Sequence, residues 1–196
     1  MTLRIGGYAA IIGSLLWIIG LGTASGDNTA FAFPGAALMV LGNVGLLVAL
    51  VGLSAFQSRR YPRLAWASFA LPFVGSVVTI VGALTGLGIT PDTISFGGFT
   101  AWELWASGML ALVAGSGLFA IASWRTGTLS RPGVALLALA AVALLVAIPG
   151  AAGLFPWEPV VSVAMFLTLG GFVAGWVVVG IGAVRADRIS LASLPG

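Results

Sequence analysis

The chain is organised as long apolar runs separated by short polar connections. Six of the runs are long enough to cross the hydrocarbon core of a bilayer, which takes about 20 helical residues. Unpaired backbone groups are not tolerated in lipid, and continuous apolar runs do not suit the alternating pattern of barrel strands, so each run is predicted to be a helix. We place the helices near residues 5–22, 35–56, 64–88, 102–124, 133–155 and 160–184. The sequence therefore predicts an all-α fold, a single six-helix transmembrane domain over residues 1–196.

The first run has a competing interpretation as a cleaved signal peptide. It follows the short basic start MTLR and precedes the small residues GTASG, which would suit a peptidase. Its 18 residues exceed the apolar core of a signal peptide, which has about 7–15 residues. We therefore expect it to remain as the first helix.

Charged residues divide between the two sides of the predicted membrane. All eight arginines fall on one side with Asp187, and the other four acids, Asp27, Asp92, Glu103 and Glu158, fall on the opposite side. Because positively charged connections stay in the cytoplasm, both termini are predicted to be cytoplasmic, in a bacterial inner membrane. This topology also explains the calculated pI near 10.7 without any nucleic-acid partner.

Composition removes most catalytic chemistry. The chain is 60% hydrophobic and 7% charged, it has no cysteine or histidine, and all its basic residues are arginine. Thiolate nucleophiles, imidazole bases, Schiff-base lysines and the commonest ligands of zinc and haem iron are therefore excluded. We expect no enzyme, no cofactor and no metal site.

Two segments around the arginine turns are similar at an offset of 65 residues. Residues 52–66, GLSAFQSRRYPRLAW, and residues 117–133, GLFAIASWRTGTLSRPG, both start with Gly-Leu and pass through a basic turn into a new apolar run. Duplication of a helix pair about an axis along the membrane normal would produce this pattern, and chance similarity in so restricted a composition is the alternative. The same rhythm resembles that of small, uncharacterised six-helix integral membrane proteins of bacteria. The resemblance implies the fold but no activity.

Asn43, in LGNVG, is the most polar side chain well inside a predicted helix. An amide at this depth needs a partner, and the flanking Gly42 and Gly45 would let a neighbouring backbone approach it. Asn43 is therefore predicted to join two helices, and a contact in a central binding site is the alternative. No acidic or basic residue is predicted at mid-membrane depth, which disfavours ion-coupled transport.

Prolines and paired glycines lie within the apolar runs. Pro72 and Pro149 each remove one helical hydrogen bond. We predict that both prolines serve helix packing. The alternative is a cavity or hinge between the third and fifth helices. Two GxxxG motifs place glycines one turn apart on a helix face. We expect them to pack helices within the chain, with contact to another subunit as the alternative. They are Gly82 with Gly86 and Gly171 with Gly175.

The two Trp-Glu pairs can be understood from local structure. Thr100-Ala-Trp-Glu103 matches a capping box, in which threonine and glutamate each bond to the other's backbone N–H. Pro159 suits the first position of the sixth helix, which makes Glu158 the residue before it, near the positive helix end. No histidine, lysine or third acid accompanies the two glutamates, so we expect these outer-face acids to be structural.

Aromatic residues concentrate near the predicted membrane boundaries, as in an interfacial belt. Trp17 and Trp176 are deeper, where packing or lipid exposure is expected and contact with a lipid, quinone or pigment is the alternative. Together these patterns favour a non-enzymatic accessory or scaffolding protein that packs with membrane lipids or other membrane protein subunits. The alternative is a carrier or channel for a neutral or apolar small molecule that passes Asn43 and the two prolines.

Overall fold

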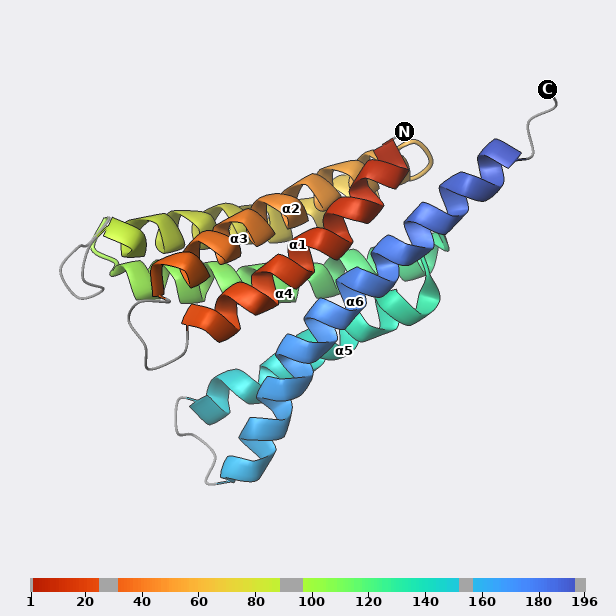
Figure 1. Ribbon diagram of the computed structural model, residues 1–196. Helices are drawn as coiled ribbons and strands as arrows, with labels where there is room; N and C mark the ends of the chain where they lie inside the picture. Colours follow the sequence, from red (N-terminus) through yellow and green to blue (C-terminus); the bar gives the residue numbers. More distant parts are fainter. Residues whose placement is uncertain (1, 25–31, 89–96, 152–156, 193–196) are drawn as a thin grey trace.

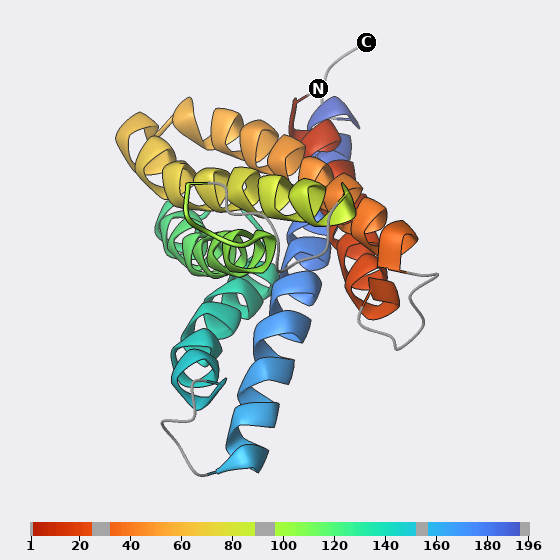
Figure 2. The ribbon, with the colours of Figure 1, turned by 90° about the vertical axis from the view of Figure 1, so that its left-hand side faces the viewer.

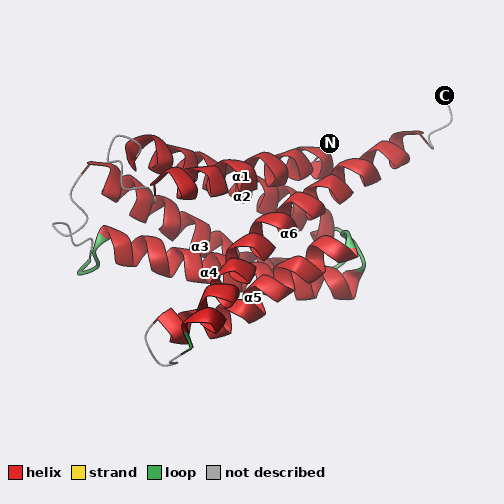
Figure 3. Cartoon of the chain, turned by 60° about the horizontal axis from the view of Figure 1, so that its bottom comes forward, coloured by secondary structure: helices red, strands yellow, loops and turns green. Residues whose placement is uncertain are grey.

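The protein folds into a bundle of helices. The computed structural model describes residues 2–24, 32–88, 97–151 and 157–192, and within these ranges there are six helices and no strand (Figure 3). All six are long and apolar enough to cross a membrane, so this is a multi-pass membrane protein and the predicted fold is confirmed. They are α1 (Thr2–Ala24), α2 (Ala32–Ser58), α3 (Pro62–Gly88), α4 (Ala101–Thr126), α5 (Arg131–Ala151) and α6 (Glu158–Ala192).

Several helices are longer than the apolar runs that predict them. The clearest case is α6, whose 35 residues continue well beyond the predicted end at residue 184. At 1.5 Å per residue it is roughly 52 Å long, and the hydrocarbon core of a bilayer is only about 30 Å thick. Hydropathy marks where lipid ends, but a helix can continue into water. The predicted extension of α5 to residue 155 lies outside the described residues.

The six helices form a closed ring. Each helix packs against its neighbours in the chain, and α6 closes the ring by packing against α1. The most extensive contacts lie within the three hairpins α1–α2, α3–α4 and α5–α6. Duplication of a helix pair would give this arrangement, although the duplication itself stays a prediction. The start of α1 and the end of α6 lie at the same end of the bundle (Figure 1).

Helix direction gives the bundle two chemically different ends. We call the end that carries the start of α1 and the α2–α3 and α4–α5 connections the arginine end, and the other the acidic end. The expectations for Asp27 and Asp92 lie outside the described residues. The acidic end carries Glu103 and Glu158. The arginine end carries the arginines whose surroundings are described: Arg4, Arg59, Arg60, Arg63, Arg125, Arg131 and Arg185.

Glycines spaced seven residues apart set the separation of α1 and α2. A methyl group on Gly13 would lie 2.8 Å from the carbonyl oxygen of Gly42, and one on Gly20 would lie 2.6 Å from that of Gly35. The obstructing atoms belong to the backbone, which cannot turn aside as a side chain does. A seven-residue repeat keeps small residues on one helix face, as in a left-handed supercoil. The α3–α4 hairpin also has glycines seven residues apart on both helices: Gly75 and Gly108 face each other, Gly82 faces the backbone of Trp105, and Gly115 faces Pro72.

The α5–α6 hairpin diverges from the other helices toward the acidic end (Figures 1 and 2). It is tied to its neighbours elsewhere, because Gly7 of α1 packs against Gly180 of α6 and Gly117 of α4 packs against Ala141 of α5. Toward the acidic end the backbone of Trp105 in α4 lies against Gly82 of α3. The divergence leaves space on the α5–α6 side of α4.

Candidate functional site

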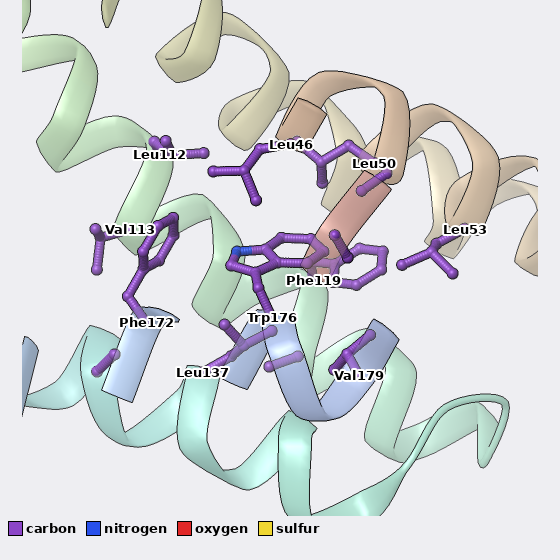
Figure 4. Close-up of a cluster of buried hydrophobic side chains, with 14 of the residues drawn as sticks. Leu46, Leu50, Leu53, Leu112, Val113, Phe119, Leu137, Phe172, Trp176 and Val179 are labelled. Atoms are coloured by element: carbon purple, nitrogen blue, oxygen red, sulfur yellow. The ribbon is translucent and has the colours of Figure 1, made fainter. Parts of the chain in front are cut away.

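Large side chains fill the centre of the ring. Trp17, Phe119, Phe172 and Trp176 are all 0% exposed. The ring of Trp17 meets Phe172 edge-on at 5.6 Å between centroids, and Phe119 stacks on Trp176 at 5.5 Å. Figure 4 shows the indole of Trp176 among Phe119 and aliphatic side chains, including Leu46. Of the two roles predicted for the deep tryptophans, packing or lipid exposure, the structure shows packing.

Three polar atoms in this core lack hydrogen-bond partners among the described residues. They are the indole Nε1 atoms of Trp17 and Trp176 and the Oδ1 of Asn43. Buried indole N–H groups normally find an acceptor, and an unsatisfied buried donor costs about 1–3 kcal/mol. The centre of the bundle is therefore less stable than its close packing alone would make it.

Asn43 is fully buried on the face of α2 that points to the bundle centre, at helical spacing from Met39 and Leu46. Its Nδ2 donates to the Met39 carbonyl of its own helix at 3.0 Å. The predicted bond to a neighbouring helix is thus wrong. Gly42 and Gly45 do bring α1 close, but they lie on a different face of α2 from Asn43. A mid-helix amide can reach the carbonyl one turn earlier, and here it does.

A second buried amide makes the interhelical bond that was expected of Asn43. Gln57 of α2 is 1% exposed, and its Nε2 donates to Ser123 Oγ of α4 at 2.6 Å. The Ser123 hydroxyl in turn donates to the Phe119 carbonyl at 2.7 Å. The sequence pattern places Gln57 in the arginine turn, because the apolar run ends before it. Its position four residues after Leu53, on the buried stripe of α2, is the signal that identifies it.

Pro72 packs against a neighbouring helix, and Pro149 is next to a glycine that does. Pro72 is buried in the continuous helix α3, and Gly115 of α4 lies against its ring. Pro149 lies in the last turns of α5, where the adjacent Gly150 packs against Val161 of α6. These contacts support the packing role. The alternative of a cavity between α3 and α5 does not fit the ring, because α4 lies between these helices.

The GxxxG glycines pack within the chain where their surroundings are described. Gly82 lies against the Trp105 backbone of α4, while Gly171 and Gly175 lie against Ala140 and Leu137 of α5. These contacts support the intrachain role predicted for these three glycines. Gly86 is part of α3, but its surroundings lie outside the described residues.

The predicted capping box at the start of α4 is present. The Thr100 backbone N–H donates to Glu103 Oε2 at 2.8 Å, and the Glu103 backbone N–H donates to Thr100 Oγ1 at 3.2 Å. The Thr100 hydroxyl also donates to Glu103 Oε2, at 2.9 Å. These bonds satisfy donors that a helix start otherwise leaves free. The Glu103 carboxylate is therefore occupied by its own helix.

The start of α6 differs from its prediction by one residue. The Trp157 carbonyl accepts from the backbone N–H groups of Val160 at 3.0 Å and Val161 at 3.2 Å, so Trp157 is the capping residue. Glu158 is the first helical residue and Pro159 the second. A carboxylate in the first turn still complements the positive helix end. Glu103 and Glu158 lie on helices that scarcely touch.

Aromatic side chains at both ends face outward. Trp102 and Trp157 at the acidic end and Trp66 and Trp124 at the arginine end are each more than half exposed. Exposed tryptophans at the ends of apolar helices match an interfacial belt. Phe31, Phe96 and Phe155 also belong to the predicted belt, and they lie outside the described residues.

An apolar groove follows from the divergence of α5 and α6. It has a volume of about 350 Å³ and lies in the half of the bundle toward the acidic end. Trp105 and Met109 of α4, Ala147 and Ile148 of α5, and Met165 and Leu169 of α6 line it. Asn43 does not line this groove, so the polar side chain that the sequence singles out is not part of it.

The residues described above form packing contacts and an apolar groove. Among the described residues, no three histidine, cysteine, aspartate or glutamate side chains lie close enough together to hold a metal ion. Comparison with protein-family models, curated proteins and solved structures finds no match for this chain.

Proposed function

We propose that the chain is a non-enzymatic accessory or scaffolding protein that packs with lipids and other membrane subunits. The observation that carries the proposal is the filled centre of the ring, where stacked tryptophan and phenylalanine side chains stand in place of a passage. A transport path for a polar solute would need polar groups along it.

The buried polar side chains support the same proposal. In the described part of the chain they are serine, threonine, asparagine and glutamine, with no charged residue among them. Most of the hydroxyl groups are used by their own helices: Ser14 donates to the Ala10 carbonyl at 2.7 Å, and Thr168 donates to that of Ala164 at 2.8 Å. The donors of these hydroxyl groups are already used by carbonyls of the same helix, so they are not available to bind a solute.

The scaffolding role predicts a complex larger than one chain. Extraction in a mild detergent or in native-lipid particles, followed by mass measurement, should yield the chain with co-purifying protein or as an oligomer. A strictly monomeric particle without a protein partner would contradict the scaffolding role.

We place the protein in a bacterial cytoplasmic membrane, with the arginine end in the cytoplasm. The segregation of arginine and acid between the two ends supports this orientation. Because the chain has no cysteine, single cysteines can report it directly. A membrane-impermeant maleimide on intact cells should label Phe99→Cys at the acidic end but not Thr128→Cys at the arginine end. The opposite labelling would reverse the orientation.

Carriage of an apolar small molecule is the second candidate, and the groove between α4 and the α5–α6 hairpin favours it. Its volume of about 350 Å³ is within the range of ligand pockets, roughly 300–1,000 Å³. Ala106→Phe would fill this groove, whereas Val163→Phe adds the same ring on an exposed face of α6 outside it. Binding of an apolar fluorescent probe should fall only in Ala106→Phe. Equal binding by both variants would contradict a role for the groove.

A further inference from the structure

A second apolar groove lies between α4 and α5 at the arginine end. It has a volume of about 270 Å³ and is lined by Ala120, Ile121, Trp124 and Arg125 of α4 and by Val134 and Ala138 of α5. This volume is near the lower limit for ligand pockets, roughly 300 Å³. The groove therefore fits a segment of one acyl chain and not a whole lipid.

Two arginines stand where this groove reaches the end of the helices. Arg125 is in the last turn of α4 and lines the groove itself. Arg131 is the first residue of α5, and its guanidinium lies 5.9 Å from the centre of the Trp124 ring. The tryptophan thus holds the second guanidinium beside the groove by a cation–π contact.

Both guanidinium groups are exposed, and neither has an ion pair or a hydrogen bond to any residue that the structure describes. Each guanidinium presents five N–H donors in a planar fork, a geometry that suits phosphate oxygens. Arg125 and Arg131 are therefore two unpaired cations at the end of a hollow whose remaining lining is apolar.

We propose that this groove binds one anionic phospholipid of the leaflet at the arginine end. A segment of an acyl chain lies along Ala120, Val134 and Ala138, and the phosphate is held by Arg125 and Arg131. Basic pockets between membrane helices suit anionic headgroups. A zwitterionic lipid would add a cation beside two cations, and free phosphate would leave the apolar lining uncovered. The site is independent of whether the protein acts as a scaffold or as a carrier.

Two other roles for these arginines, a structural one and a topological one, predict different lipid binding from the groove. A basic residue in the last turn of a helix complements the negative end of the helix dipole, which would make Arg125 purely structural. Arginines that serve only as topology signals would attract anionic lipid at any position on this end of the bundle. The groove predicts that Arg125 and Arg131 bind lipid more tightly than other arginines at the same end.

The test is native mass spectrometry of the full chain, extracted from vesicles of phosphatidylcholine and phosphatidylglycerol. The wild-type chain should retain one phosphatidylglycerol, and titration of this lipid gives its Kd. Arg125→Gln with Arg131→Gln should weaken binding about 30-fold, from the usual contribution of two arginines near an anionic surface. Arg59→Gln with Arg60→Gln removes the same charge from the α2–α3 turn, outside this groove, and should leave the Kd unchanged.

Two further arms separate the headgroup from the acyl chain. Ala138→Phe leaves both arginines in place but fills the groove, and it should weaken phosphatidylglycerol binding as well. Inorganic phosphate added in excess should not displace the lipid. Equal weakening in the two arginine pairs, equal retention of phosphatidylcholine, or displacement by inorganic phosphate would each overturn the proposal. A thermal melt of each variant checks folding, and the exposed arginine pairs decide the question even if Ala138→Phe does not fold.

Discussion

Replacement of Gly13 by alanine tests whether glycine spacing holds the first hairpin together. The new methyl carbon would lie 2.8 Å from the Gly42 carbonyl oxygen, 2.8 Å from the Leu46 backbone nitrogen and 2.9 Å from the Gly45 carbonyl carbon. Comfortable contacts of this kind are about 3.5–4.0 Å, so α1 and α2 must separate by up to about 1 Å. Overpacking costs about 1–3 kcal/mol, and the better helix propensity of alanine returns up to about 1 kcal/mol. We expect a net loss of up to about 2 kcal/mol, which leaves the variant about 1–3 kcal/mol less stable than one that gains only the helix propensity.

Gly170→Ala is the matched control, because nothing lies within 4 Å of the position that its methyl group would occupy in α6. It should be neutral or slightly stabilising, since only the gain in helix propensity remains. Unfolding by titration of dodecyl sulfate into a mild detergent, followed by tryptophan fluorescence and circular dichroism, compares the two variants. If Gly13→Ala unfolds at the same midpoint as Gly170→Ala, the close contact of α1 and α2 does not depend on this glycine.

Two further predictions concern hydrogen bonds. Ser123→Ala leaves the buried Gln57 amide without its acceptor and should cost about 0.6–1.7 kcal/mol in the same titration. Adding Gln57→Met removes the unpaired amide and should restore stability. A double variant as unstable as Ser123→Ala would refute this explanation. Thr100→Ala removes the cap of α4 and should cost about 0.5–2 kcal/mol. Amide exchange should accelerate in the first turn of that helix, and unchanged exchange there would show that the cap contributes little.

The six helices and the N-terminal cap of α4 could be predicted because each depends only on residues that are close together in the sequence. Apolar runs of bilayer length specify helices whatever surrounds them. The capping box needs only Thr100 and Glu103, which lie three residues apart at the start of one helix. The outward tryptophans likewise follow from position along the chain, since the ends of apolar runs meet the membrane surface.

The residues that join helices were harder to identify, because their partners are distant in the sequence. Asn43 stands out as an amide inside an apolar run, yet it bonds to its own helix. Gln57 forms the contact between helices, and its partner Ser123 lies 66 residues away. The repeat of glycine every seven residues in α1 is visible in the sequence, but a search for GxxxG motifs does not find it. The two grooves depend on how the hairpins diverge, which no segment encodes alone.

The contact between α1 and α6 affects the order in which the bundle can assemble during biogenesis. Of the six helices, α1 is made first and α6 last, so Gly7 can meet Gly180 only after every intervening helix has been made. Each hairpin can pair as soon as its second helix is inserted, but the closing contact must wait. During that interval the side of α1 that carries Gly7 borders lipid or an insertion factor. Substitutions at Gly7 should therefore trap a late intermediate with three formed hairpins and an open side.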